Sequence, residues 1–473
     1  MMMVENIINW GNTVLWSYIL IVILVSLSIY FTIRTKFVQI TNLKEMFKLM
    51  KESSSTNSGK KQVSSFGAFC ISAASRIGTG NLAGVAIAIT LGGPGAIFWM
   101  WIMALFGAVL SFIESTLAQV YKVKDKSGFK GGPAYYMEKA LEKRWLGILF
   151  ALLITFCFGL AFNSVQANTI SAAFEEAFGI NRIVVGLILT VIVGFIIFGG
   201  IKRIVKVSQV VVPVMALFYL IIATYVVIVN IEEIPSVISL IVSSAFGIEQ
   251  AIGGGIGAAI INGVKRGLFS NEAGMGSAPV AAATANVSHP AKQGFIQTLG
   301  VFVDTLIICS ATAFIILLAE IPKEGMGGIQ ITQAALSSHI GSWASIFVAV
   351  AILLFCFSSI VGNYYYGESN LEFIKENKTI IFVFRIGVLG MVAFGSVSSL
   401  SMVWNLADLF MALMAVVNLI ALALTGKIAI AVLKDYLNQK KEGKDPVFYA
   451  NNIEGLKNVE CWEEERIEER KKA

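Results

Sequence analysis

Ser75-Arg-Ile-Gly-Thr-Gly-Asn-Leu-Ala-Gly84 interrupts an apolar run, residues 66–90, that is long enough to cross a lipid bilayer. Glycines and polar residues stand where a lipid-facing helix would carry leucines. Backbone groups left unpaired in hydrocarbon are costly, so such a segment must be buried in protein or line a watery cavity. The stretch therefore predicts a discontinuous helix that offers backbone groups to a solute and its ion. A kinked helix whose glycines only allow close packing is the alternative.

A second stretch, Arg266-Gly-Leu-Phe-Ser-Asn-Glu-Ala-Gly274, matches Arg76–Gly84 without a gap, with Arg, Asn, Ala and Gly at identical spacing. Both stretches are polar, interrupted by glycine and placed correspondingly in the two halves of the chain. Paired interruptions of this kind indicate a transporter site at the contact between two structural repeats.

The composition indicates a polytopic membrane protein, because 56% of the 473 residues are hydrophobic and only 14% are charged. The five cysteines are scattered singly along the chain, which favours neither a disulfide framework nor a metal site.

Charge asymmetry predicts the topology of the spans. With the amino terminus outside, the external loops contain only Arg182 and Lys323 of the 36 Lys and Arg, as the positive-inside rule requires. The carboxyl terminus is then cytoplasmic. The eleven predicted spans are residues 13–33, 66–90, 95–121, 145–170, 183–200, 204–230, 252–288 (interrupted), 295–319, 343–366, 380–398 and 404–430.

The second and seventh spans then run in opposite directions, so the matched stretches belong to a five-plus-five inverted repeat in an all-α membrane protein. Residues 231–251 are predicted to be an external segment with a short helix, and the tail a solvated appendage. The predicted divisions are a first helix and loop (1–65), a first repeat (66–230), a second repeat (231–430) and a charged cytoplasmic tail (431–473).

Further motifs carry a family resemblance. They are Leu91-Gly-Gly-Pro-Gly-Ala-Ile-Phe-Trp-Met-Trp101, Lys130-Gly-Gly-Pro133 and Gly263-Val-Lys-Arg-Gly-Leu-Phe-Ser-Asn-Glu-Ala-Gly-Met-Gly-Ser-Ala-Pro279. With the first stretch, they resemble the alanine or glycine:cation symporter family, the sodium:alanine symporters, from about residue 11 to 430.

The resemblance implies a leucine-transporter-type fold with a peripheral first helix. It also implies symport of alanine or glycine with Na⁺ by alternating access, in the cell membrane. The absence of long glycosylated external loops in the sequence suits a prokaryote. No organic cofactor, nucleic acid or obligate protein partner is expected, and membrane lipid surrounds the protein.

An amino-acid site needs free amides and a helix amino terminus for the substrate carboxylate, and oxygen atoms for its ammonium group. The first break supplies the amides, while the second break and Gln166 supply oxygens. Ordinary core packing is the alternative for Phe269, and an interhelical hydrogen bond is the alternative for Gln166. The predicted substrate-binding residues are Gly78, Thr79, Gly80, Asn81, Gln166, Phe269, Ser270, Asn271 and Met275.

A sodium ion prefers a compact cage of hard oxygens, and Ser358-Ser359 is the strongest hydroxyl pair in a predicted span. The resemblance to the leucine-transporter fold places the carbonyls of Ala74 and Ile77 opposite these serines. Hydrogen bonds from the hydroxyls to the preceding helical turn are the alternative.

Charged residues inside spans are expensive and usually functional. Arg76 and Arg266 precede the two breaks. With acids such as Glu272, they predict a gate of ion pairs on the cytoplasmic side, or permanent pairs that hold the repeats together. The permanent role is favoured for Glu114. The other candidate acids are Asp304 and Asp408.

Three rivals remain. A proton-coupled transporter of the same fold would use Asp304 to relay protons. A channel would need a continuous polar stripe rather than two breaks. A membrane-bound enzyme is disfavoured, because the sequence contains no His-Glu-x-x-His, no phosphate-binding loop and no base beside Ser270 or Ser358.

Overall fold

The computed structural model describes residues 2–55, 63–125, 128–199, 201–247, 255–321 and 326–462. Within these ranges the chain is almost wholly helical, with one short antiparallel hairpin that pairs Lys124 with Phe129. The predicted tail residues 463–473 lie outside the described part.

The first half contains α-helices, π-helical segments (η) and the two strands. In chain order these are α1 (Met2–Val14), η1 (Leu15–Leu20), α2 (Ile21–Arg34), α3 (Val38–Thr41), α4 (Leu43–Ser55), α5 (Ser65–Arg76), η2 (Gly80–Gly84), α6 (Val85–Gly92), α7 (Gly95–Val120), β1 (Val123–Asp125), β2 (Gly128–Lys130), α8 (Pro133–Leu141), α9 (Arg144–Ile154), η3 (Thr155–Phe162), α10 (Asn163–Phe178), α11 (Arg182–Ile197) and α12 (Ile201–Val229).

The elements of the second half are all helical among its described residues; here η4 and η6 are short 3₁₀ turns, and η5 is again π-helical. The elements are η4 (Ile231–Glu233), α13 (Ile234–Ala245), α14 (Ile256–Asn271), α15 (Ala278–Ala283), α16 (Pro290–Phe302), η5 (Val303–Cys309), α17 (Ser310–Leu317), α18 (Ile329–Ile340), α19 (Trp343–Ile374), α20 (Lys378–Val397), α21 (Leu400–Lys441) and η6 (Ala450–Asn452).

Two discontinuous helices occupy the predicted places. α5 begins at the N-cap Ser64, ends at Arg76 and is followed by extended backbone at Ile77, with φ −79° and ψ 96°. The helix resumes as η2 and α6. α14 ends at Asn271, and α15 begins at Ala278. The prediction of two interrupted helices is confirmed.

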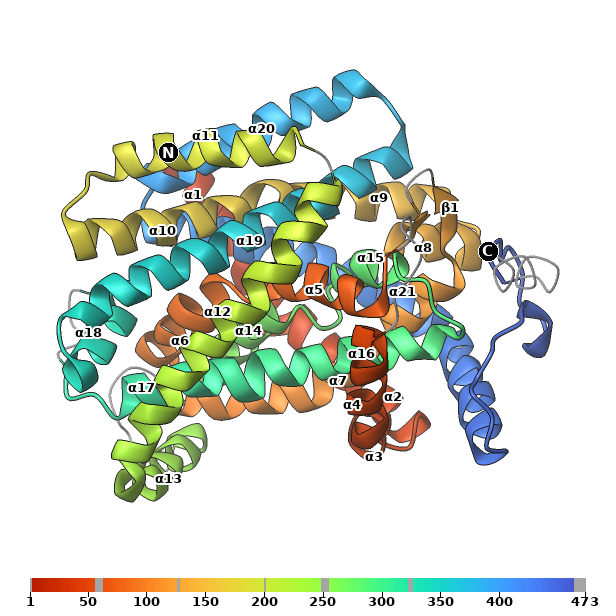
Figure 1. Cartoon of the computed structure of the whole chain (residues 1–473), viewed down its shortest axis with the longest axis horizontal. Coiled ribbons are helices and arrows are strands. Elements are labelled where there is room, and N and C mark those ends of the chain that lie inside the picture. The colour runs from red at the N-terminus through yellow and green to blue at the C-terminus, as the bar shows by residue number, and fades with distance from the viewer. Residues whose placement is uncertain are drawn as a thin grey trace.

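Among the described residues, seven helices are long and apolar enough to cross a membrane, or eight if α12 and α13, bent by 102° at their junction, are taken as one span. Helix also occupies the remaining predicted spans, which are either broken or, like Arg182–Ile197, shorter. The count of eleven crossings stays a prediction. Several long helices, among them α7, α10, α16 and α19, lie roughly along the horizontal direction of Figure 1, α12 crosses the view diagonally, and the predicted short helix is α13 at one end.

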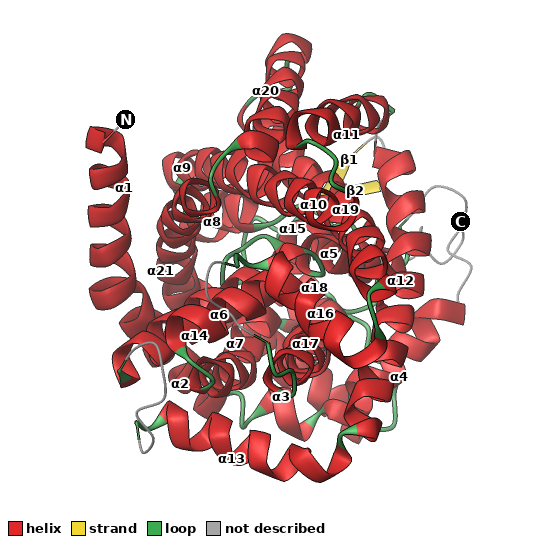
Figure 2. Ribbon diagram, turned by 90° about the vertical axis from the view of Figure 1, so that its left-hand side faces the viewer, coloured by secondary structure: helices red, strands yellow, loops and turns green. Residues whose placement is uncertain are grey.

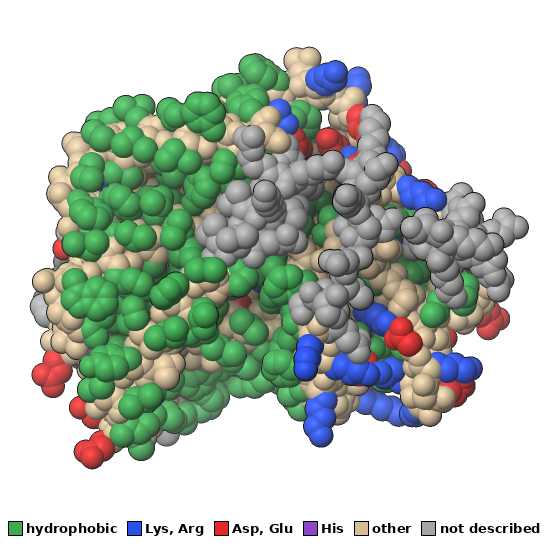
Figure 3. All heavy atoms as spheres, viewed as in Figure 1, with side chains coloured by type: hydrophobic (Ala, Val, Ile, Leu, Met, Phe, Trp, Pro, Cys, Tyr) green, Lys and Arg blue, Asp and Glu red, His purple; other side chains and the backbone are tan. Residues whose placement is uncertain are grey.

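The surface has the polarity of a membrane protein. Large apolar side chains such as Phe195 (74% exposed) and Leu187 (62%) face outward over the middle of the molecule. Lys and Arg gather over α4 and the end of α21, whereas acidic side chains lie beside α13 at the opposite end (Figure 3). This separation agrees with the predicted topology, in which α13 is external.

The first helix, formed by α1, η1 and α2, stands at the edge of the bundle (Figure 2). It packs mainly against α21 and α7 and lies outside the core that contains the two broken helices. The prediction of a peripheral first helix agrees with this placement.

The expectation of a solvated tail is wrong for the described residues up to Trp462. Phe448, Cys461 and Trp462 are each at most 1% exposed. The indole of Trp462 donates a 2.8 Å hydrogen bond to the carbonyl of Gln119 at the end of α7, and the amide of Phe448 donates to Ser288. These three apolar side chains anchor the charged segment to the end of the bundle. Their positions along the chain form no helical stripe.

Candidate functional site

The two broken helices touch at Gly80. A β-carbon added at Gly80 would lie 3.0 Å from the Cα of Ser270 and 3.1 Å from the ring of Phe269. Only a glycine lets the backbone of the first break approach the second break so closely. The structure thus brings the two matched stretches into direct contact.

Thr79 connects the first break to two other helices. Its amide and its hydroxyl donate hydrogen bonds of 3.1 and 2.7 Å to the Oε1 of Gln166 on α10. Its hydroxyl also lies 3.0 Å from the Sγ of Cys356 on α19. All three side chains are buried. Gln166 therefore forms an interhelical hydrogen bond, which was the alternative interpretation of this residue. The bond lies within the predicted site.

Asn81 and Ser270 meet at Asp304. The Oδ1 of Asn81 accepts a hydrogen bond from the amide of Gly78 at 2.9 Å, and its Nδ2 donates to the Oδ1 of Asp304 at 2.7 Å. The hydroxyl of Ser270 donates to the other carboxylate oxygen at 2.7 Å. Asn271, at the end of α14, donates to the hydroxyl of Thr305, the residue next to Asp304. One buried carboxylate thus ties the two breaks together.

Three of the helices that form the break contact are locally π-helical. η2 contains Asn81, η3 contains Phe162 next to the polar face of α10, and η5 contains Asp304 and Thr305. π-Helical turns widen a helix and often occur at functional sites, because they leave backbone groups free and re-aim side chains. Three such segments converge on the contact between the breaks.

The predicted sodium ligands face one another. The hydroxyl of Ser358 lies 3.5 Å from the carbonyl of Ala74, and that of Ser359 lies 3.3 Å from the carbonyl of Ile77. Both hydroxyls also lie within 3.0 Å of the carbonyl of Phe355 in the preceding turn. The four predicted groups are therefore brought together, and the hydrogen bonds to the preceding turn are present as well.

An aromatic stack covers one side of the break contact. The ring of Phe269 lies between Phe162 and Trp404, with centroid distances of 4.4 and 4.6 Å. The guanidinium of Arg266 lies 4.3 Å from the ring of Trp404, and its Nη2 donates to both carboxylate oxygens of Asp408 at 2.5 Å. The stack and the ion pair together close this side of the site.

The two arginines have separate partners and do not join one cluster of ion pairs, and the gate role of each stays a prediction. Because the broken helices are antiparallel, the residues that precede the two breaks lie on opposite sides of the site. Arg266 pairs with Asp408 on the side where α14 enters. Arg76 instead donates to the carbonyl of Gln297 at 3.3 Å and to the hydroxyl of Ser111 at 3.5 Å.

Two buried glutamates hold the backbone around the second break. Glu272 accepts 2.6 Å hydrogen bonds from the hydroxyls of Ser75 and Ser277. Glu114 accepts hydrogen bonds of 3.0 Å from the amides of Gly274 and Gly276. Glu114 thus has a structural role, as favoured from the sequence, although its partners are amides rather than an arginine.

Met275 lies in the segment that Glu114 holds, four residues beyond Asn271, and is fully buried. Its predicted place in the pocket wall stays a prediction. The sequence reasoning missed Phe162, Cys356 and Trp404. Trp404 and Asp408 are four residues apart and so share one helical face, which is a signal that the sequence does contain.

The arrangement defines a class of protein: a membrane transporter whose site lies where two interrupted, antiparallel helices meet. The fold agrees with this class. A manganese transporter from Eremococcus coleocola superposes with a TM-score of 0.55 at 14% identity, covering 80% of this chain and 88% of that chain. The shared architecture is the leucine-transporter type.

The chain belongs to the sodium:alanine symporter family, whose family model matches residues 1–450. It is 58% identical to a probable sodium/glutamine symporter of Bacillus subtilis, over 97% of this chain and 96% of that protein. It is 59% identical to an amino-acid carrier protein of the same organism, over 98% and 99%. A sodium/alanine symporter of Methanococcus maripaludis is 36% identical over 93% and 99%. The protein is thus a multi-pass amino-acid symporter and not an enzyme.

Proposed function

We propose that this protein imports alanine or glycine together with Na⁺, by alternating access, across the cell membrane. The observation that carries the proposal is the break after α5. There, free carbonyls at the end of one half-helix face two serine hydroxyls, and the amides at the start of the next half-helix face Gln166 and Asn81.

The substrate carboxylate is assigned to the start of the η2–α6 half-helix. The positive end of the helix dipole and the amides of Gly78, Thr79 and Gly80 favour an anion there. In the structure the side chains of Asn81 and Gln166 accept hydrogen bonds from the first two amides. A substrate carboxylate would take over these hydrogen bonds from the two side chains or share the amides with them. Asn81 and Gln166 therefore keep the amides oriented for the substrate.

The sodium ion is assigned to the carbonyls of Ala74 and Ile77 and the hydroxyls of Ser358 and Ser359. All four groups are buried hard oxygens. The carbonyl end of α5 carries the negative end of a helix dipole, which favours a cation. Ile77 and Gly78 connect the sodium ligands directly to the substrate amides, so occupation of one site affects the geometry of the other.

The packing around Gly80 supports a small side chain for the proposed substrate. Phe269 touches Gly80, and Phe162 and Trp404 cover Phe269 from both sides. A methyl group fits such a wall more readily than a carboxamide chain. Because one relative is named for glutamine, glutamine is the competing substrate that must be tested.

Proton coupling is a second candidate, supported by Asp304. This buried carboxylate bonds to both breaks, through Asn81 and Ser270, so its protonation would change the contact between them. A proton could then take the place of Na⁺ as the coupling ion.

The orientation is also a proposal. We place the amino terminus outside and the carboxyl terminus in the cytoplasm. The Lys and Arg side chains over α4 and the end of α21 support this placement (Figure 3). We propose that lipid surrounds the protein, and that transport requires no protein partner, nucleic acid or organic cofactor.

Uptake of labelled alanine into proteoliposomes tests the function. Gradients of Na⁺, K⁺ or pH are imposed separately, with unlabelled glycine or glutamine as competitors. Accumulation driven by Na⁺, suppressed by glycine and abolished by Thr79→Val supports the proposal. Ser358→Ala should weaken its sodium dependence. Accumulation driven by a pH step alone would replace Na⁺ by a proton. Stronger competition by glutamine than by glycine would overturn the proposed substrate.

A further inference from the structure

The peripheral first helix contacts the ion pair that closes the site, although it lies outside both repeats. The inference drawn here rests on the proposed function and orientation, which put the Arg266–Asp408 ion pair on the external side of the site, where we assign it as the external gate. The contact centres on η1 (Leu15–Leu20), a π-helical segment of the first helix that is separate from the three at the break contact.

Trp16 is the central residue of this contact. It is fully buried, and its indole Nε1 donates a 3.2 Å hydrogen bond to the backbone carbonyl of Asp408. A carbonyl inside a helix already accepts from its own helix, so this bond is additional and fixes the position of α21 at the gate residue. The π-helical turn at Leu15–Leu20 gives the first helix the local widening that aims a large side chain inward.

The charges at the gate explain why this position needs support. Two cations, Lys265 and Arg266, face the single carboxylate of Asp408, at 3.8 and 2.5 Å. The Lys265 ammonium also lies 5.3 Å from the centre of the Trp16 ring, a distance at which an aromatic face attracts a cation. The Trp16 ring therefore attracts the Lys265 ammonium in competition with Asp408, while Arg266 makes the shorter contacts to both carboxylate oxygens.

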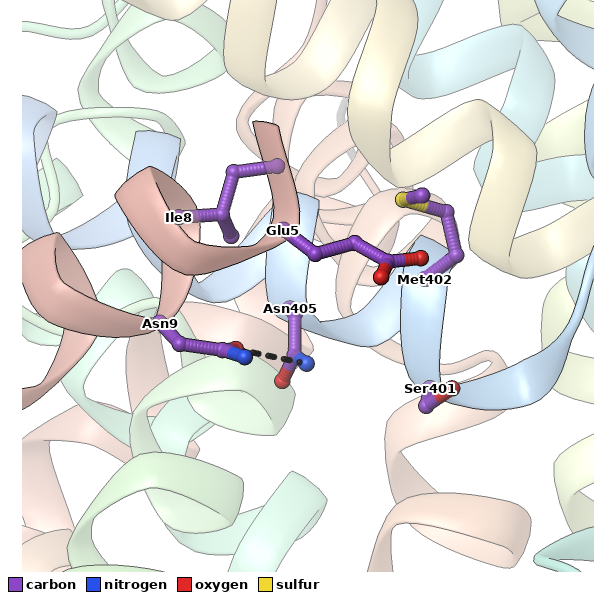
Figure 4. A pocket seen from close by; sticks show the side chains of 6 residues that line it. All are labelled: Glu5, Ile8, Asn9, Ser401, Met402 and Asn405. Carbon is purple, nitrogen blue, oxygen red and sulfur yellow. Dashed lines mark hydrogen bonds between the residues drawn. The ribbon is translucent and has the colours of Figure 1, made fainter. Parts of the chain in front are cut away.

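A polar seam continues this contact toward the outer end of the first helix. Asn12 donates to the carbonyl of Asn405 at 2.9 Å, and Asn405 donates to Asn9 at 3.2 Å. Figure 4 shows Asn9 and Asn405 joined by this hydrogen bond, in the lining of a pocket of about 240 Å³ between α1 and α21. Residues 9, 12 and 16 share one face of the first helix, and 405 and 408 share one face of α21.

We propose that Trp16 is a positioning residue of the external gate, and that the first helix holds Asp408 in the orientation that pairs it with Arg266. The first helix then takes part in transport through the gate, without touching substrate or ion. Loss of Trp16 favours the open gate, because Asp408 loses a fixed position and Lys265 competes with Arg266 for its carboxylate.

Thiol labelling tests this inference. Cys309 and Cys356 lie at the break contact beneath the gate, beside Ser270 and Thr79. With the other three cysteines changed to alanine, right-side-out vesicles are treated with a membrane-impermeant methanethiosulfonate. The labelling rate then reports how often the gate opens outward. The variants are Asp408→Asn, Trp16→Phe and Trp16→Leu.

The matched control is Trp10→Leu, because Trp10 lies on the same helix but is 70% exposed. Trp16→Phe keeps the aromatic ring and loses the N–H donor, so labelling should rise about two- to twelvefold, the equivalent of one hydrogen bond. Trp16→Leu also loses the attraction for Lys265 and should label faster still, while Trp10→Leu labels like the parent. Thermal unfolding of Trp16→Phe in detergent should match that of the parent, which separates gate opening from unfolding.

Two results would overturn the inference. If Asp408→Asn accelerates labelling and both Trp16 variants behave like Trp10→Leu, the gate exists but Trp16 does not position it. If Asp408→Asn leaves labelling unchanged while alanine uptake is normal, the external gate is elsewhere and the role of Trp16 fails with it. Absent uptake of alanine in the parent would instead contradict the proposed function.

Discussion

Gly78→Ala should impair the binding of sodium and substrate together. A β-carbon at this position would overlap the Oγ of Ser359 and lie 2.9 Å from the Oε1 of Gln166. The first neighbour belongs to the proposed sodium site and the second to the proposed substrate site. Gly78 is not among the residues with positive φ, so the effect of alanine is one of space and not of backbone conformation.

The size of the effect follows from the overlap. Forcing an extra methyl group into a well-packed site costs about 1–3 kcal/mol. Expressed as affinity, this cost is about a five- to 150-fold increase in the half-saturating concentrations of alanine and sodium. Both concentrations should rise in the same variant, because one β-carbon displaces a residue from each site.

Gly84→Ala is the matched control in the same stretch. Its β-carbon would lie 3.5 Å from the ring of Trp404 and 3.7 Å from the carbonyl of Thr79, which are ordinary contacts. Uptake of labelled alanine into proteoliposomes is measured over a range of sodium concentrations for the parent and both variants. If Gly78→Ala transports with the same half-saturating concentrations as Gly84→Ala, the assignment of this break to both sites is refuted.

Three other substitutions test separate parts of the structure. Ser359→Ala should raise the half-saturating sodium concentration about two- to twelvefold and leave alanine affinity at saturating sodium unchanged; an equal loss of both would contradict its place in the ion site. Glu114→Gln should lower the free energy of unfolding by about 1–3 kcal/mol, because the NH2 group of glutamine cannot accept from the second of the two backbone amides, and a melting temperature equal to that of the parent would count against this anchor. Burial lowers the pKa of His289, although Asp435 opposes the shift, so the folded protein favours the neutral ring. The stability contributed by this neutral ring is present above the unfolded pKa of about 6.5. It is lost as the pH falls below that value and through the lower pKa of the folded state. His289→Asn keeps a helix cap and should reduce the loss of thermal stability between about pH 7 and 5; an unchanged pH profile would show that this histidine does not titrate on unfolding.

The parts of the fold that could be predicted from the sequence are those that hydrocarbon enforces. Glycine and polar residues inside an apolar run demand a buried break, and the matched spacing of Arg76 and Arg266 revealed the second break. The distribution of Lys and Arg predicted a polarity that the surface of the molecule also shows. Each of these inferences depends on local composition, which the sequence displays directly.

The missed parts depend on contacts between distant segments. Phe162 and Trp404 reach Phe269 from different helices, and no spacing along the chain connects them. The π-helical turns escape prediction because neighbouring helices, and not the residues within the turn, compensate for the disrupted hydrogen bonding. The separate partners of Arg76 and Arg266 escaped prediction because the two arginines were treated as equivalent, although the helices that carry them run in opposite directions.

The docked tail changes where the protein should be cut for experiments. A truncation at residue 430, where the predicted repeat ends, would remove the aromatic covering that Trp462 places 4.7 Å from the buried ammonium of Lys122. It would also expose the apolar surface against which Phe448 packs. In a sample purified in detergent, no lipid would cover this surface. Trp462 is therefore the earliest sensible end for a shortened chain, and an affinity tag or fluorescent fusion belongs after that residue.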